Sequence, residues 1–138
     1  MIDTRHLTYE TQGDGQVIDL TADLNRELED SDVSGGTVTI FVTGTTVGIT
    51  IMEYEPGLVE DMKTLMGRVA PRDASYRHDI LNNDDNGHSH TRALLIGPSL
   101  VVPVADGSPM LGTWQRVVLV DFDSHPRSRN VILQIMGE

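Results

Sequence analysis

The chain has 138 residues and no cysteine, so residues 1–138 are expected to form a single domain without disulfides or thiolate-bound zinc. Its net charge of −11, with Lys63 as the only lysine, argues against nucleic acid and anionic membranes as partners, since both attract basic surfaces. No apolar run approaches the roughly 20 residues of a membrane span, and the polar N-terminus does not resemble a signal peptide. We therefore expect a cytoplasmic protein.

Hydrophobic spacing predicts the elements in the first part of the chain. Residues 4–12 alternate weakly and are expected to form a strand, which a turn at residues 13–15 ends. Leucines recur every four residues along one face from Leu20, which predicts a helix from Thr21 to about Asp30.

The central part of the chain continues with two strands and a helix. Residues 37–43 alternate and are rich in β-branched side chains, which indicates a strand. Residues 45–54 predict another strand, in which Gly48 indicates either a bulge or a close backbone approach. An amphipathic helix is expected to begin at residues 55–57 and to end before Pro71.

The rest of the chain contains a long polar segment and then more strands. Residues 72–89 have few aliphatic side chains and are interpreted as a functional loop, followed by a short helix at residues 90–96. Strand patterns recur at residues 100–104, 114–122 and 130–136. Without a repeated βαβ rhythm, these elements predict an α+β fold of packed, mostly antiparallel β-sheets with two or three flanking helices.

Three of the five histidines, His78, His88 and His90, fall within thirteen residues and are interspersed with aspartates. Imidazole and carboxylate are ligands for divalent ions, so this cluster predicts a metal site, with zinc as the expected ion. His88 and His90 would face the same side on an extended segment and diverge on a helix. The alternative is a solvated polar loop in which the histidines cap backbone groups.

The chain contains four further motifs, which are Tyr76-Arg77-His78, Asn86-Gly87-His88-Ser89-His90, Leu111-Gly112-Thr113-Trp114-Gln115 and Pro126-Arg127-Ser128-Arg129. Together they resemble the YjbQ-like family (UPF0047). The similarity extends from about residue 37 to the C-terminus. One motif departs from the family pattern, since Gly44 stands where the family often has histidine and Met52 where it has asparagine. The glutamate of that motif is retained as Glu53, so we interpret the chain as a subfamily variant.

The resemblance implies an α+β fold, a homotrimer with sites near subunit interfaces, and in some members a weak thiamine-phosphate synthase activity. That reaction joins a pyrimidine diphosphate to a thiazole phosphate and requires cationic donors for the phosphates. Outside the C-terminal motif, only Arg77, Arg92 and Arg116 lie in or near the motifs, and no glycine-rich phosphate loop precedes a helix. The sequence itself therefore gives little support to this reaction.

The candidate catalytic residues are Glu53, as a general base, and Arg92, as a carboxylate or phosphate ligand. The residues expected to bind a small molecule are Thr45, Thr46, Asn86, Thr113, Trp114 and Gln115. Three of these residues have a non-functional alternative: Glu53 as a surface charge, Arg92 as a surface ion pair, and Trp114 as a core or interface anchor.

Two functions follow from these residues. One is an enzyme that uses a histidine-bound divalent metal on a small, phosphorylated metabolite, and the other is a non-catalytic trimeric module that binds a metal or a metabolite. The acidic, lysine-poor composition fits either a protein that works in concentrated salt or an acidic mesophilic enzyme that prefers arginine.

Overall fold

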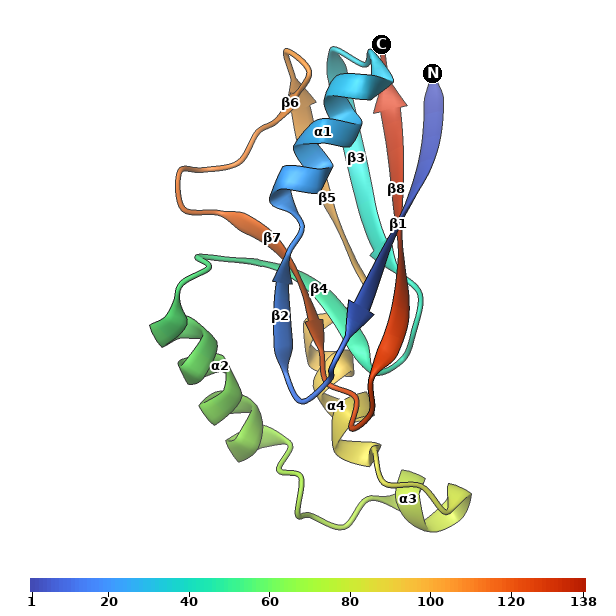
Figure 1. Ribbon diagram of the computed structural model, residues 1–138, viewed down its shortest axis with the longest axis vertical. Helices are drawn as coiled ribbons and strands as arrows, with labels where there is room; N and C mark the ends of the chain where they lie inside the picture. Colours follow the sequence, from blue (N-terminus) through green and yellow to red (C-terminus); the bar gives the residue numbers. More distant parts are fainter.

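A computed structural model describes all residues from Met1 to Glu138 (Figure 1). Eight strands and four helices follow one another along the chain. In order they are β1 (Ile2–Thr11), β2 (Gln16–Asp19), α1 (Thr21–Ser31), β3 (Gly35–Val42), β4 (Val47–Met52), α2 (Pro56–Val69), α3 (Arg77–Asn82), α4 (Gly87–Ile96), β5 (Ser99–Ala105), β6 (Ser108–Pro109), β7 (Arg116–Asp121) and β8 (Arg127–Gly137).

The strands form two antiparallel sheets. One has five strands in the order β1-β8-β3-β5-β6, and the other has three in the order β2-β7-β4. Both chain termini lie at one end of the molecule, while α3 and α4 lie at the opposite end and α2 runs beside the small sheet (Figure 1). The predicted α+β class with mostly antiparallel sheets is confirmed.

The main core lies between the large sheet, the small sheet and α1. Alternate residues of β3 and β8 point into it, as strand geometry requires, and the leucine stripe of α1 packs against them. Strand β7 is buried on both faces, because Val117 and Leu119 join the main core while Val118 and Val120 join a smaller cluster with Met66 of α2. The small sheet is thereby fixed between two apolar layers.

The structure corrects three predicted elements. The helix expected at residues 90–96 begins at Gly87, so His88 lies inside α4 rather than before it. The segment expected to be a long loop contains α3, a helix of six residues that is too short for a periodic pattern. Strand β2 was missed because its four residues pair only with β7 and alternate too briefly to be recognised.

Gly48 marks a close approach, not a bulge. The pairing of β4 with β7 runs without interruption through this residue. A Cβ atom at position 48 would lie 2.6 Å from Cγ2 of Ile96 and 2.9 Å from the carbonyl oxygen of Gly97. The missing side chain lets the end of α4 lie directly against β4, which brings this helix to the site described below.

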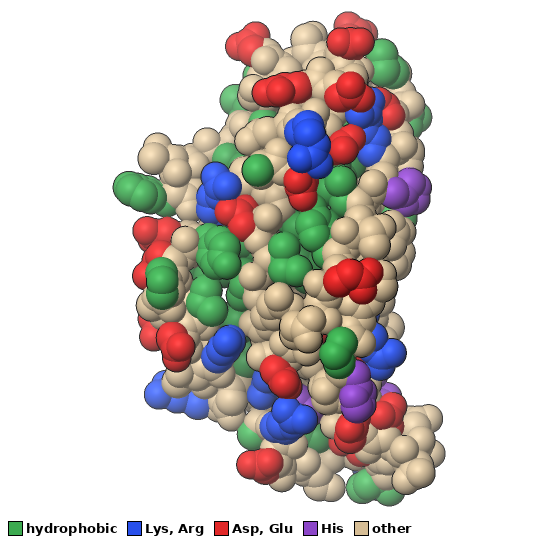
Figure 2. Space-filling view, viewed as in Figure 1, with side chains coloured by type: hydrophobic (Ala, Val, Ile, Leu, Met, Phe, Trp, Pro, Cys, Tyr) green, Lys and Arg blue, Asp and Glu red, His purple; other side chains and the backbone are tan.

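Acidic side chains outnumber basic ones, 21 against 10, and Figure 2 shows them scattered across the visible face between uncharged groups. Six of the arginines pair with carboxylates, for example Arg26 with Asp23 and Arg72 with Asp14. No helix is both long and apolar enough to cross a membrane.

Candidate functional site

A polar pocket of about 310 Å³ lies at the end of the molecule that is remote from the termini. The β3–β4 loop, the start of α4 and the β7–β8 turn meet there. No hydrophobic side chain lines the pocket, whose walls are Gly44, Thr45, Thr46, Asn86, His90, Asp123, Arg127 and Arg129. Loops held by two packed sheets are a common place for binding residues.

Arg129 forms the floor of this pocket and is 6% exposed. Its Nε and Nη2 donate to the two carboxylate oxygens of Asp121, at 2.6 and 3.0 Å. Nη2 also donates to Oγ1 of Thr46, at 2.7 Å, and that hydroxyl donates to Asp123 at 2.8 Å. The buried charges are thus matched, as a stable interior requires.

Asp123 is held as a carboxylate. Burial would raise its pKa, but hydrogen bonds from Thr46 and from Nε of Arg127 lower the pKa to about 2. Arg127 donates to Asp123 through Nε alone, at 2.9 Å. Its two terminal nitrogens make no hydrogen bond within the chain. Those nitrogens are free to donate to a ligand.

Gly44 shapes the other wall. Its φ of +138° is a backbone conformation that residues with a side chain rarely adopt, and a Cβ there would lie 2.8 Å from Nη1 of Arg129. The loop therefore rests on the guanidinium, and a side chain at this position would have to displace Nη1 of Arg129 and Cγ1 of Val47. In this chain the space beside residue 44 is filled by these two side chains.

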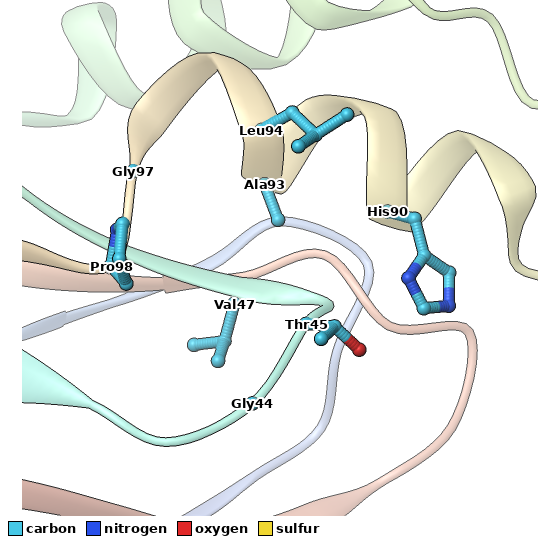
Figure 3. Close-up of a pocket in the computed structure, with 8 residues that line it drawn as sticks. All are labelled: Gly44, Thr45, Val47, His90, Ala93, Leu94, Gly97 and Pro98. Atoms are coloured by element: carbon cyan, nitrogen blue, oxygen red, sulfur yellow. The ribbon is translucent and has the colours of Figure 1, made fainter.

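An apolar pocket of about 350 Å³ adjoins the polar one, and the two share Gly44, Thr45 and His90. Its remaining walls are Val47, Ala93, Leu94, Gly97 and Pro98 (Figure 3). The ring of His90 hangs from α4 towards the loop that carries Thr45 (Figure 3). His90 thus stands at the junction of a polar and an apolar compartment.

His78 and His90 lie side by side, with ring centroids 4.2 Å apart. Nδ1 of His78 is 3.2 Å from Oδ1 of Asp79, which also accepts a hydrogen bond from the backbone of Gly87. Burial, and then the neighbouring His78, lower the pKa of His90. The lowered pKa favours the neutral imidazole, which has a ring nitrogen that can accept a proton.

His88 lies apart from this pair. It is 2% exposed, its ring is near Tyr76, and its Nδ1 has no hydrogen-bond partner. Burial, and then the positive charge of Arg92, lower its pKa. Of the two arrangements open for His88 and His90, the helical one holds, and residues two apart on a helix point in different directions.

The three histidines therefore do not converge within one chain. No group of three or more histidine, aspartate or glutamate side chains is arranged to hold a metal ion. His78 and His90 supply two nitrogen ligands, whereas zinc takes four ligands, of which a catalytic site draws three from protein. A zinc ion at this site stays a prediction, and the residues of a single chain do not complete its shell.

The other predicted residues divide between two places. Thr45, Thr46 and Asn86 line the polar pocket, as described above. Glu53, Thr113 and Trp114 line a separate pocket of about 310 Å³ at the far end of β4. Gln115 lies beside that pocket and uses its side chain to close the loop, by accepting a hydrogen bond from the backbone of Gly112 at 2.7 Å.

Arg92 lines neither pocket. Its Nε donates to the carbonyl oxygen of Ala70 at 2.9 Å, so the side chain ties α4 to the end of α2. Burial lowers its pKa. This contact explains its conformation as a link between helices, and the structure gives it no opening onto the polar pocket.

Asp123, Arg127 and Arg129 were not recognised as site residues from the sequence. They alternate on either side of the turn at His125 and Pro126, and alternate residues of a strand point to one face. The alternation of ionisable side chains beside this turn could therefore have indicated a site. The sequence does not show which loops these side chains contact.

The comparisons with known proteins cover almost the whole chain. The family described as UPF0047 protein YjbQ-like matches residues 5–138. A UPF0047 protein of Archaeoglobus fulgidus is 39% identical over 94% of this chain and 98% of its own length. One of Methanothermobacter thermautotrophicus is 36% identical over 98% of this chain and 92% of its own length.

Solved structures agree with this assignment. A hypothetical protein from Aeropyrum pernix K1 superposes with a TM-score of 0.91, at 33% identity and 99% coverage of both chains. A protein of unknown function from Sulfolobus solfataricus P2, described as YbjQ-like, superposes with a TM-score of 0.90, at 29% identity and full coverage of both chains. The motifs, the fold and the sequence identities agree, and the chain belongs to the YjbQ-like UPF0047 family.

Proposed function

We propose that the chain is an enzyme that binds a small phosphorylated metabolite across the two joined pockets and uses His90 to accept a proton from it. The observation that supports this most strongly is the position of His90 between two compartments. One is lined without hydrophobic side chains and has unused arginine donors, and the other is apolar, while burial lowers the pKa of His90. A phosphate in the first and a carbon skeleton in the second would place the reacting atoms beside His90.

The polar pocket suits a phosphate monoester. The two terminal nitrogens of Arg127, Nη1 of Arg129 and the hydroxyl of Thr45 have no partner within the chain, and all are donors for phosphate oxygens. Asp121 and Asp123 offset the charges of the two arginines. The pocket therefore has little net charge, and we expect it to prefer one phosphate group to a diphosphate.

Asn86 indicates what else the ligand carries. The residue is 5% exposed, its Oδ1 has no hydrogen-bond partner, and its side chain does not cap α4. An unsatisfied buried polar atom costs about 1–3 kcal/mol, so it is retained where a ligand satisfies it. We infer that the metabolite presents a hydroxyl or amine donor near its phosphate.

Binding of glycerol 2-phosphate, measured by calorimetry, tests the proposal. This probe combines a phosphate with hydroxyl donors, and we expect Arg127→Gln to weaken it about tenfold or more, because a charge-assisted hydrogen bond is lost. Arg26→Gln, on the exposed face of α1, is the matched control and should bind as the unaltered chain does. Equal affinities of the two variants would contradict the proposal.

Turnover separates the enzyme from a non-catalytic binding module. The family resemblance suggests one reaction to assay, the joining of a pyrimidine diphosphate to a thiazole phosphate, and the weakly charged pocket is consistent with at most slow turnover. His90→Gln should abolish any product while leaving glycerol 2-phosphate binding within about threefold, because His90 is not the main phosphate ligand. Binding without any turnover would favour the module.

A divalent metal at His78 and His90 is the second candidate, favoured by the 4.2 Å separation of their rings. Elemental analysis of protein purified without a histidine tag checks it. We expect bound zinc to fall when His78 and His90 are both changed to alanine and to be unaffected by His6→Ala, on the outer face of the large sheet. Less than about a tenth of an equivalent in the unaltered chain would exclude a metal of functional importance.

We further propose that copies of the chain associate as the homotrimer that the resemblance implies. The outer face of the large sheet supports association, because its side chains on β3, β5 and β8 are uncharged although the chain has a net charge of −11. These side chains are Thr37, Thr39, Phe41, Ser99, Val101, Pro103, Asn130, Ile132, Gln134 and Met136. Chains of like net charge repel one another least when they meet through an uncharged surface. Light scattering should give three times the chain mass, and Thr39→Glu should lower that mass; a monomer at micromolar concentration and high salt would refute the proposal.

A further inference from the structure

A second pocket, of about 310 Å³, lies where β4 leaves the small sheet. Met52 and Arg116 form the last pair between β4 and β7, so the segments beyond them, residues 53–55 and 113–115, leave the sheet next to each other. The pocket between them is lined by Asp19, Glu53, Tyr54, Glu55, Thr113, Trp114 and Arg116. It shares no residue with the pockets around His90, which lie at the opposite end of β4.

Two aromatic rings in this pocket have free faces. Trp114 is 71% exposed and Tyr54 is 46% exposed, although rings of this size are normally well buried. The ring contacts of the chain are those of Tyr76 with His88 and of His78 with His90, so neither Trp114 nor Tyr54 stacks on another ring. An anchor in the core of its own chain is therefore excluded for Trp114.

The charged groups around these rings leave a negative excess. Asp19 is compensated, because Nε of Arg116 donates to its carboxylate at 2.7 Å. Glu55 caps the N-terminus of α2 by accepting hydrogen bonds from the backbone N–H groups of Gly57 and Leu58, which hold its carboxylate at this position. Glu53 is exposed and has no ion-pair or hydrogen-bond partner. One unpaired carboxylate, that of Glu53, and one held at a helix N-terminus, that of Glu55, thus face a pocket with two exposed aromatic rings, and neither is paired with an arginine.

The aromatic rings and the carboxylates of this pocket together favour a positively charged ligand. A cation is attracted both by the negative face of an aromatic ring and by carboxylates that no arginine neutralises. A phosphate would be repelled by both, and a second copy of this acidic chain would bring like charge to the same place. A small inorganic cation would gain little from the rings, since it holds its water strongly.

We propose that this pocket binds an organic ammonium cation, with its alkylated nitrogen against Trp114 and Tyr54 and its charge compensated by Glu53 and Glu55. The pocket volume fits a head group with a few carbon atoms. The site is separate from the proposed phosphate pocket, so each can fail without the other. An effector or a second substrate that carries an alkylammonium group is the ligand class that this chemistry recognises.

Trp114 is the only tryptophan of the chain, so its fluorescence reports directly on the pocket. Titration with choline should change the emission saturably, whereas 3,3-dimethylbutan-1-ol, a neutral molecule of the same shape, should bind at least about tenfold more weakly. Sodium chloride at matched ionic strength is the control for screening. An equal response to the neutral molecule or to the salt would overturn the proposal, as would no response to choline.

Variants locate the binding. Glu53→Gln should weaken choline about threefold to tenfold, while Glu60→Gln, an exposed residue of α2 outside the pocket, should not. His90→Gln should also leave choline binding unchanged, which separates this site from the one around the histidines. If the emission of Trp114 depended on protein concentration and ignored choline, a second copy would be the occupant and the cation site would be refuted.

Discussion

The candidate functional residues at the two ends of strand β4 differ in burial. At the Val47 end, Arg129 and Asp123 are buried and bound to each other through Thr46, so the site is part of the folded framework. At the Met52 end, Trp114 and Glu53 are exposed and add little to the fold. Residues of the first site are therefore hard to alter without loss of stability, while those of the second can be changed freely.

The largest expected effect comes from the buried guanidinium. Arg129→Leu leaves Asp121 and Asp123 buried with only part of their compensation, and we expect a loss of about 3–5 kcal/mol in the free energy of unfolding, measured by urea denaturation. Arg116→Leu, which breaks a partly exposed pair at the other end, should cost about 1 kcal/mol or less. Similar losses for both variants would mean that the ends do not differ.

The next effect tests the backbone at Gly44. Gly44→Ala combines an unfavourable φ with a clash against Nη1 of Arg129, and we expect it to destabilise the chain by about 1–3 kcal/mol. Gly67→Ala is the matched control, because a Cβ there meets nothing within 4 Å and alanine favours the helix α2. That variant should gain about 0.5–1 kcal/mol in thermal or chemical unfolding.

Asp123 predicts how stability depends on pH. Its pKa is lowered from the ordinary 3.8 to about 2, so the folded state favours the ionised form more than the unfolded chain does. The resulting stability is present above pH 4 and is lost as the pH falls from about 4 to about 2. The free energy of unfolding should decrease as the pH falls through this range, and Asp123→Asn should make that decrease less steep. The same slope in the variant would assign acid unfolding to other carboxylates.

The smallest effect concerns salt. Unpaired surface acids such as Glu29, Glu53 and Glu60 repel one another, and this repulsion is screened between about 0.05 M and about 2 M KCl. We expect the melting temperature to rise over that range, and Glu53→Gln to reduce the rise slightly. A flat response would show that local arginine pairs already compensate the surface, and it would remove the argument for a protein adapted to concentrated salt.

Sequence patterns predicted much of the fold because apolar periodicity is local. The leucine stripe of α1 and the alternation of β3 locate these elements, and the order of elements without a βαβ rhythm predicted the α+β class that the family resemblance also implied. Short elements escaped: α3 and β2 are stabilised by tertiary contacts rather than by their own periodicity.

The site was predicted only in part. His90, Thr45, Thr46 and Asn86 do meet, but the partition of Glu53 and Trp114 into another pocket depends on which end of β4 each one follows. The partners Arg127 and Arg129 come from a strand far along the chain. Their roles required the pairing of β3 with β8, which no local pattern reveals.

The most direct test of the proposed function follows the histidine rings by nuclear magnetic resonance while glycerol 2-phosphate is added. The resonances of His90 and its neighbour His78 should shift saturably, while His6, whose side chain lies on the outer face of the large sheet, serves as an internal control and should not move. The Arg127→Gln variant should show the same spectrum without ligand and little shift with it. Rings that do not respond, or that all shift alike, would contradict a phosphate pocket beside His90.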